Sequence, residues 1–180
     1  SEVFFRMLHF RVMEIFPRAR DRFNQPLILM TPHRYNPDIN NRELDLMAKG
    51  VVWGMEFITS IVRRPFDKFV FIVDMTNWGL RNADMKLMSK LFNTIQPNYP
   101  DYMGSTYIVN APWILNGLWK LLEMMLDEHT KSKIAFLKAN ESKELFGALF
   151  DPSDLYERIG GTKVEINPTS KGEWEPEDIK

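Results

Sequence analysis

The five residues from Phe69 to Val73 are all apolar, and no polar side chain alternates among them. A strand with one face in water shows such alternation, whereas a strand buried on both faces reads as a continuous β-branched and aromatic run. A strand of that kind lies inside a sheet whose two faces are both covered. We therefore predict that residues 69–73 form the central strand of the fold.

Apolar runs and helical stripes alternate along the rest of the chain. Further strands are predicted at Leu27–Thr31, Ser105–Val109 and Ile134–Leu137. Helices are predicted at 40–63 with a capping pair of Asn40 and Glu43, from Asn82 to before Pro97, at 112–126 and at 142–150, with a last helical turn at 153–158. This order predicts an α/β fold with a mainly parallel sheet. Residues 4–16 mix both periods and receive no assignment, and residues 17–26 read as a polar turn.

The composition excludes several classes of protein. With 180 residues and 44% hydrophobic side chains, the chain suits one folded domain with a real core. A formal net charge of −1 provides no positive field for nucleic acid. The absence of cysteine fits a reducing compartment. The chain has no run of 18 apolar residues, the length that a membrane-spanning helix needs. Because the chain starts at Ser1 without a methionine, we expect a fragment of a longer protein.

Catalytic and metal-binding signatures are absent from the sequence. There is no phosphate loop, no dinucleotide fingerprint, no nucleophile elbow and no H-E-x-x-H motif. His9, His33 and His129 are scattered without metal-ligand spacing. We expect no metal, no cofactor and no catalytic residue, although a triad of distant residues stays open. Asp74 follows the central strand, where it could face a ligand or, as we expect, cap a turn.

The predicted helix from Pro112 to Leu126 is the most apolar of the chain. Pro112 suits a first helical position, and the polar side chains are confined to one narrow stripe of Asn116, Lys120 and Glu123. About 15 residues at 1.5 Å each give roughly 22 Å, which is short of a ~30 Å membrane core. Two interpretations stay open: a core helix covered on both sides, or a helix between an apolar cavity and a membrane.

Several motifs resemble those of the CRAL-TRIO, or Sec14-like, lipid-binding family, over about Val12 to Val164. In chain order they are Tyr99–Gly104 (YPDYMG), Tyr107–Trp113 (YIVNAPW), Leu126–Asp127 followed by Thr130–Ile134 (TKSKI), and Gly160–Gly161. The small helical module that usually precedes this domain is missing or truncated. The resemblance implies one domain at 1–164, with a mixed, mostly parallel sheet, and a polar tail or linker at 165–180.

The resemblance also implies a hydrophobic pocket above the sheet, closed by the helix after Pro112 as a mobile gate. Gly160 and Gly161 would then form the gate hinge. The candidate gate and pocket residues, each equally open to plain packing, are Trp113, Ile114, Leu118, Leu121, Leu122 and Met125.

Members that bind phosphatidylinositol contact its headgroup at positions that correspond to Asp101, Thr130 and Lys133. Lys133 could neutralise the phosphate, Thr130 could donate to its oxygens, and Asp101 could accept from inositol hydroxyls. Asp101 stands where the family has Glu, Tyr102 where Arg is frequent, and Glu128 where Pro is usual. These departures put phosphatidylinositol specificity in doubt, and a structural role, with Thr130 capping a turn, stays open.

We therefore expect a non-enzymatic domain that binds one phospholipid or similar hydrophobic ligand and exchanges it at a transient membrane surface. We expect it to be cytoplasmic and peripherally associated with membranes. The alternative is a lipid-sensing adaptor or regulatory module that works with other domains of a longer chain. An α/β hydrolase is a minor third hypothesis. A basic cluster could be solvated surface or touch anionic lipid; its members are Arg18, Arg20, Arg22 and Arg34.

Overall fold

Five strands form one mixed sheet in the order β1-β2-β3-β4-β5. The computed structural model describes residues 11–35, 37, 44–62, 68–99 and 102–165. The strands are β1 (Met13–Arg20), β2 (Pro26–Met30), β3 (Phe69–Asp74), β4 (Met103–Val109) and β5 (Ile134–Leu137). Strand β1 pairs with β2 antiparallel, and all other pairs are parallel. The predicted α/β class and the central place of β3 are confirmed.

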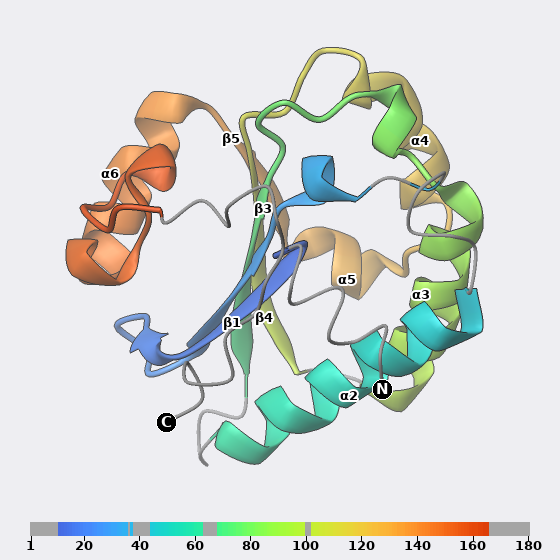
Figure 1. Cartoon of the computed structure of the whole chain (residues 1–180), viewed down its shortest axis with the longest axis horizontal. Helices are drawn as coiled ribbons and strands as arrows, with labels where there is room; N and C mark the ends of the chain where they lie inside the picture. Colours follow the sequence, from blue (N-terminus) through green and yellow to red (C-terminus); the bar gives the residue numbers. More distant parts are fainter. Residues whose placement is uncertain (1–10, 36, 38–43, 63–67, 100–101, 166–180) are drawn as a thin grey trace, which may run out of the picture.

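Helices cover both faces of the sheet (Figure 1). One layer holds α2 (Leu44–Ile61), α3 (Met85–Asn98), α4 (Leu115–Glu123) and α5 (Glu128–Ser132). The other face carries α6 (Ala139–Leu149) and the short 3-10 turns η3 (Pro152–Asp154) and η4 (Glu157–Ile159). Strands β2 to β5 follow one another in sequence and in space. Right-handed crossovers between them therefore bring α2 to α5 onto the same face.

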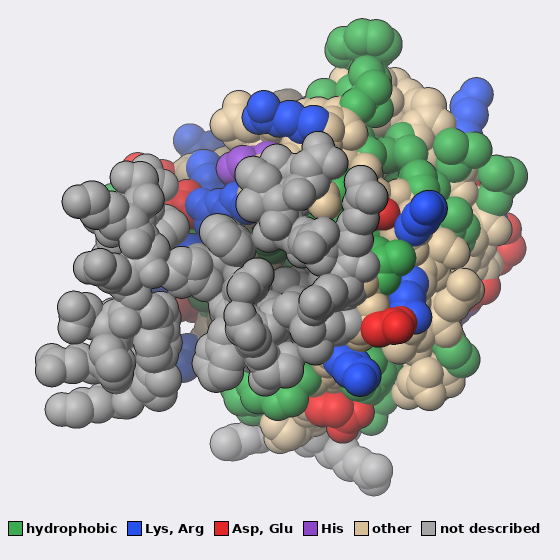
Figure 2. Space-filling view, turned by 45° about the vertical axis from the view of Figure 1, so that its right-hand side comes forward, with side chains coloured by type: hydrophobic (Ala, Val, Ile, Leu, Met, Phe, Trp, Pro, Cys, Tyr) green, Lys and Arg blue, Asp and Glu red, His purple; other side chains and the backbone are tan. Residues whose placement is uncertain are grey.

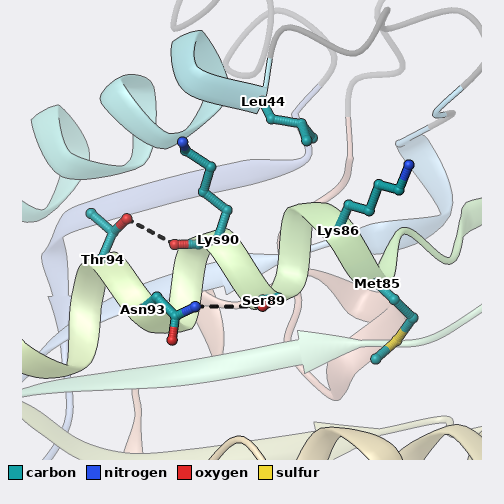
Figure 3. A pocket seen from close by; sticks show the side chains of 7 residues that line it. All are labelled: Leu44, Met85, Lys86, Ser89, Lys90, Asn93 and Thr94. Atoms are coloured by element: carbon teal, nitrogen blue, oxygen red, sulfur yellow. Dashed lines mark hydrogen bonds between the residues drawn. The ribbon is translucent and has the colours of Figure 1, made fainter.

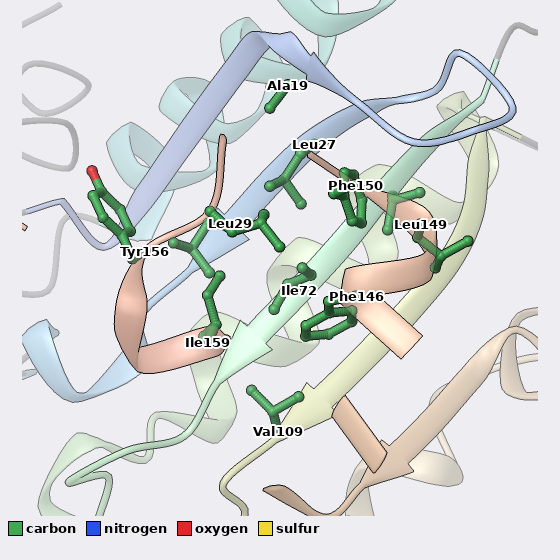
Figure 4. Close-up of a cluster of buried hydrophobic side chains, with 12 residues drawn as sticks. Ala19, Leu27, Leu29, Ile72, Val109, Phe146, Leu149, Phe150, Tyr156 and Ile159 are labelled. Carbon is green, nitrogen blue, oxygen red and sulfur yellow. The ribbon is translucent and has the colours of Figure 1, made fainter. Parts of the chain in front are cut away.

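The core under α6 shows why β3 carries no polar alternation. Phe146 and Phe150 lie over Leu27, Leu29 and Ile72 of the sheet (Figure 4). The neighbouring residues Ile28 and Phe71 point the other way, into the core beneath α2 and α3. Both faces of the central strands are thus buried, as the sequence predicted.

Strand β1 was missed by the sequence analysis, and the predicted polar turn at 17–26 is wrong. The strand continues to Arg20, with an irregular register to β2 between Phe16 and Arg20. Pro17 lies in that interval, where its missing N–H costs little because β1 is an edge strand. The real turn covers 21–25 and is stabilised by Asp21, whose carboxylate accepts from the N–H groups of Phe23 and Gln25.

Asn82 does not cap α3, contrary to the prediction. The cap is Asp84, whose carboxylate accepts from the N–H of Leu87 at 2.9 Å. Asn82 is buried and donates its side-chain amide to the carbonyls of His33 and Tyr35, 49 and 47 residues away. The side chain of Asn82 therefore binds distant backbone carbonyls, although local capping rules assigned it to the start of α3.

The ends of α2 and α3 also differ from the predicted ones. Within the described residues α2 begins at Leu44, so the predicted capping pair of Asn40 and Glu43 lies outside them. The predicted apolar stripe of α2 is buried at Val51, Met55 and Ile58. Helix α3 continues through Pro97 to Asn98, one residue beyond the start of the expected break.

Replacing Phe146 by alanine should destabilise the fold strongly. The ring has no exposed surface and packs edge-to-face on Tyr107 and Phe150, with centroids 5.6 and 6.4 Å away. Phe146→Ala should lower the free energy of unfolding by about 3–5 kcal/mol, measured by urea denaturation. The control is Leu80→Ala, because Leu80 is 60% exposed; it should cost less than about 0.5 kcal/mol. Equal losses for the two variants would contradict this assignment of the core.

Candidate functional site

Helix α4 is shorter than the helix predicted at 112–126. It contains nine residues, Leu115–Glu123, and is preceded by a turn in which the N–H of Leu115 donates to the carbonyl of Pro112. The chain leaves β4 at Asn110, which has a φ of 55°. Asn tolerates this left-handed conformation better than most residues do. Pro112 therefore shapes the turn between strand and helix and is not the first helical residue.

The six predicted gate residues divide between the two sides of α4. Leu122 is buried, and Ile114, Leu118 and Met125 are partly buried. In contrast, Trp113 is 83% exposed and Leu121 is 47% exposed. Two further apolar side chains were not named as gate residues: Leu115, which is buried, and Met124, which is 73% exposed. Their helical spacing relative to Leu118 and Leu121 would have been the signal for finding them.

The inward side of α4 packs directly on the sheet. Leu115, Leu118 and Trp119 belong to one cluster with Ile108 of β4 and Trp78 of the loop after β3. The ring of Trp119 also lies edge-to-face on Phe136 of β5, with centroids 4.9 Å apart. The inward side chains of α4 thus pack on β4, on β5 and on the loop after β3.

The outward side of α4 is apolar as well. Trp113, Leu121 and Met124 are exposed there, and Phe136 of β5 is 43% exposed. In the space-filling view of this side of the molecule, hydrophobic side chains lie among Lys and Arg side chains (Figure 2). An ordinary surface helix turns one polar side to water. Helix α4 instead has apolar groups on both sides, as expected for a helix that lies between an apolar cavity and a membrane.

A hollow of about 660 Å³ lies along α3, where Lys90 extends toward α2 and forms an ion pair with Asp45 (Figure 3). Its lining residues are Leu44, Met85, Lys86, Ser89, Lys90, Asn93 and Thr94. Five of these seven residues have polar side chains, two of them lysines, whereas ligand pockets for apolar molecules are lined mainly by hydrophobic side chains, so we do not assign the lipid tails to this hollow.

Two of the three predicted headgroup residues lie together at α5. The N–H and hydroxyl of Thr130 donate to the Asp127 carboxylate at 2.7 and 2.8 Å, so Thr130 is part of the cap of α5. Lys133 ends the same helix, and its N–H donates to the carbonyl of Thr130. Asp101 lies outside the described residues. The capping role of Thr130 is thus present, and the headgroup role of all three residues stays a prediction.

The predicted hinge glycines end η4 in a tightly packed loop. Gly160 has a φ of 94°, a conformation that favours glycine. A Cβ on Gly161 would lie 1.9 Å from the carbonyl oxygen of Leu155. Both glycines are therefore required by the local backbone, and their action as a hinge stays a prediction.

Asp74 joins three separate parts of the chain at the carboxyl end of β3. It is completely buried, and its Oδ1 accepts from the N–H and hydroxyl of Thr76 at 3.0 and 2.7 Å. The same oxygen accepts from the side-chain amide of Asn110, at the start of the turn into α4. Its other oxygen pairs with Arg158 of η4. The turn-capping role of Asp74 is confirmed, and sequence reasoning missed both Asn110 and Arg158 as its partners.

Arg158 extends this network to the end of the described chain. Its guanidinium donates to the Thr31 hydroxyl at 3.2 Å and to Glu165 at 2.9 Å. Glu165, which we predicted to be the first residue of a polar tail, also pairs with Arg34. Of the predicted basic cluster, Arg34 is thus engaged in ion pairs and is not available as solvated surface.

Both carboxyl groups of this network are held ionised. Burial alone would raise the pKa of Asp74, but hydrogen bonds from Asn110 and Thr76 and the charge of Arg158 outweigh it, so the pKa lies below its usual value. Burial also acts to raise the pKa of Glu165, and the hydrogen bond from Arg34 with the charges of Arg158 and Arg34 lowers it overall. Asp74 and Glu165 thus pair as carboxylates with Arg158 and Arg34, and Glu14 lies 3.8 Å from the Arg34 guanidinium as a further partner.

Asp74→Asn should destabilise the protein by about 2–4 kcal/mol at pH 7, because the guanidinium of Arg158 loses one of its two carboxylate partners. A lowered carboxyl pKa gives stability that is present above the unfolded pKa, about 3.9, and is lost as pH falls through the folded pKa. The difference between wild type and variant in urea unfolding should therefore shrink below pH 4. Asp154→Asn removes a nearby charge outside the network and is the control. An Asp74→Asn effect that is equal at pH 7 and pH 3 would refute this account.

Two further sequence expectations can be compared with the described part of the chain. Among those residues, no group of three or more His, Cys, Asp or Glu side chains is placed to hold a metal ion. None of the described helices is both long and apolar enough to cross a membrane.

Comparisons with known proteins agree with this architecture. The chain is 23% identical over 152 residues to a CRAL-TRIO domain-containing protein of Schizosaccharomyces pombe, covering 84% of this chain and 33% of that protein. It is 28% identical over 85 residues to phosphatidylinositol transfer protein CSR1 of Eremothecium gossypii, covering 47% and 20%. The crystal structure of Sfh5 shares the fold, with a TM-score of 0.69 and 18% identity, over 89% of this chain and 63% of that one.

A second Schizosaccharomyces pombe protein with a CRAL-TRIO domain is 21% identical, over 90% of this chain and 48% of its own length. The chain thus spans between a third and a half of these two curated relatives. The family model described as the CRAL/TRIO domain matches residues 13–161, which is most of the chain. The chain therefore belongs to the CRAL/TRIO domain family, whose members bind lipids or other hydrophobic small molecules.

Proposed function

We propose that this domain is cytoplasmic, binds one phospholipid or similar hydrophobic molecule between α4 and the sheet, and exchanges it at membrane surfaces with which it associates peripherally. The observation that carries the proposal is the double apolar character of α4. Leu115 and Leu122 are buried on its inward side, while Trp113 and Met124 are 83% and 73% exposed on the other. An inward apolar side suits an acyl chain, and an outward one suits a bilayer.

The proposed arrangement addresses a definite energetic problem. Moving an acyl chain from a bilayer into water costs about 0.8 kcal/mol per CH₂, so two long chains almost never leave spontaneously. Transfer into an apolar space inside a protein nearly cancels this cost. The remaining barrier is then the displacement of α4 from its cluster with Ile108 and Trp78. A bilayer that receives Trp113 and Leu121 would compensate part of that displacement.

The first test is lipid loading followed by lipid exchange. We expect native mass spectrometry to find one hydrophobic ligand per chain, and we expect the chain to move fluorescent phospholipid between vesicles. Trp113→Ala should slow this transfer several-fold through weaker membrane contact, with little change in stability because Trp113 is exposed. The control is Phe23→Ala, which removes an aromatic ring that is 49% exposed in the turn between β1 and β2.

Each outcome of this test has a defined meaning. A chain that is empty and takes up no lipid from vesicles would overturn the proposal. A chain that holds a lipid but does not exchange it would support the alternative, a lipid-sensing module. Hydrolysis of the lipid during the assay would revive the minor hypothesis of a hydrolase.

We further propose that the lipid headgroup lies near α5 and that phosphatidylinositol is a candidate ligand. The name of the relative CSR1, a phosphatidylinositol transfer protein, supports this choice. Lys133 would pair with the phosphate, and Thr130 and Asp101 would contact the headgroup.

Lys133→Ala should therefore reduce phosphatidylinositol transfer several-fold more than phosphatidylcholine transfer, in parallel vesicle assays. The reason is that the choline headgroup carries its own positive charge and depends less on an added cation. Lys131→Ala is the matched control, because Lys131 lies two residues away and pairs with Glu128 at 2.7 Å. Equal effects of the two substitutions on both lipids would place the headgroup elsewhere.

A further inference from the structure

One side chain of α3 holds the segment that follows α4. The amide nitrogen of Gln96 donates to the carbonyl of Met125 at 2.9 Å. Its amide oxygen accepts from the N–H of Asp127 at 3.4 Å. These two bonds enclose Leu126, which is 7% exposed. Gln96 thus fixes the junction between α4 and α5 through both ends of its amide group.

The other end of α4 is held in a different way. Asn110 precedes the turn into α4, and its side chain donates to the buried carboxylate of Asp74 and to the Thr76 hydroxyl, at 2.9 and 3.0 Å. Leu115, in the first turn of the helix, is 5% exposed and clusters with Trp78. This end is therefore tied to the sheet by a charged network and by the apolar core together.

The two ends differ in what their release would require. Pulling out the first turn of α4 would expose core side chains and remove an amide donor from the buried charge of Asp74, which is costly. Freeing the last turn breaks two neutral hydrogen bonds, whose partners all find water once they are exposed. Leu122 and Leu126 would lose their cover as well, and apolar lipid would replace it. The last turn is thus the easier end to release.

We infer that Gln96 is a latch, that α4 opens at its C-terminal end, and that the ligand passes between α3 and α4 beside this side chain. The inference rests on the proposed lipid exchange for the identity of the ligand and for the apolar cover of Leu122 and Leu126, but the hydrogen bonds of Gln96 that hold the last turn do not depend on it. Gln96 acts here as a positioning residue: it holds the helix closed through the backbone at residues 125 and 127. Asn110 marks the opposite end, about which the helix pivots.

The motion can be measured directly because the chain contains no cysteine. Spin labels at Met124→Cys and Glu144→Cys report the distance from the last turn of α4 to α6, which lies across the sheet. A second pair, Asn116→Cys and Glu144→Cys, reports the first turn of α4. All three positions are exposed. Electron-spin distance measurements on both pairs then separate an opening at one end from a shift of the whole helix.

In the Gln96→Ala background, the distance distribution of the 124–144 pair should broaden toward longer values, and that of the 116–144 pair should stay unchanged. Asn98→Ala is the matched control, because Asn98 lies on the same helix and donates to the Thr94 carbonyl within α3. Gln96→Glu is the second variant: its carboxylate keeps the acceptor for Asp127 and loses the donor to Met125. It should open the 124–144 pair less than Gln96→Ala does, or equally.

An unchanged 124–144 distance in both Gln96 variants would overturn the latch, as would equal changes in the two label pairs. The lipid assay separates this result from the proposed function. We expect Gln96→Ala to raise the rate of lipid release roughly five- to tenfold, the low end of the effect of losing two hydrogen bonds, because the bond from Asp127 is long at 3.4 Å. A one-ended opening without any lipid uptake would leave the latch standing and remove the transfer function. If Gln96→Ala exchanges lipid at the wild-type rate and both label distances are unchanged, the latch would be overturned and the transfer function would stand.

Discussion

The buried carboxylate of Asp74 is the interaction on which the arrangement of this molecule depends. An ionised group without exposed surface is stable only if its charge is compensated by hydrogen bonds and a counter-ion. Thr76, Asn110 and Arg158 supply this compensation from three separate segments. The turn after the central strand, the turn that leads into α4 and the C-terminal segment are thus fixed relative to one another by a single side chain.

Apolar and polar interactions have different tasks in this fold. The core between the sheet and α6 is made of interlocking side chains around Phe146, with no exposed surface at its centre, and gives that side of the molecule its rigidity. The opposite side of the sheet carries α4. Helix α4 rests on the sheet through apolar contacts that a hydrophobic ligand could replace, while hydrogen bonds from Asn110 and Gln96 decide where its two ends lie. The neutral bonds of Gln96 can be exchanged with water at small net cost, whereas the bond from Asn110 to the buried carboxylate of Asp74 is costly to break.

The exposed apolar side chains of α4 belong to neither of these sets of contacts. Trp113 and Met124 expose apolar surface to water without adding to the core. Members of the CRAL/TRIO family bind lipids or other hydrophobic small molecules, and the packing over Ile108 and Trp78 would have to change before the proposed ligand could lie between α4 and the sheet. The short α5, with Thr130 in its cap and Lys133 at its end, lies directly beyond this helix in the chain.

The sequence by itself determined the features that follow from local periodicity. Phe69–Val73 and Ile134–Leu137 are strands, and Val51, Met55 and Ile58 face the core, because burial of one face or two leaves a repeat in the chain. Only the tertiary structure decided what depends on distant partners. Strand β1 pairs with β2 at the sheet edge and includes Pro17. The side chain of Asn82 binds distant carbonyls and does not cap α3. Asp74 pairs with Arg158, which lies 84 residues further along the chain. Hydrogen-bond partners and ion pairs are chosen by proximity in space, and proximity over such separations has no periodic signal in the sequence.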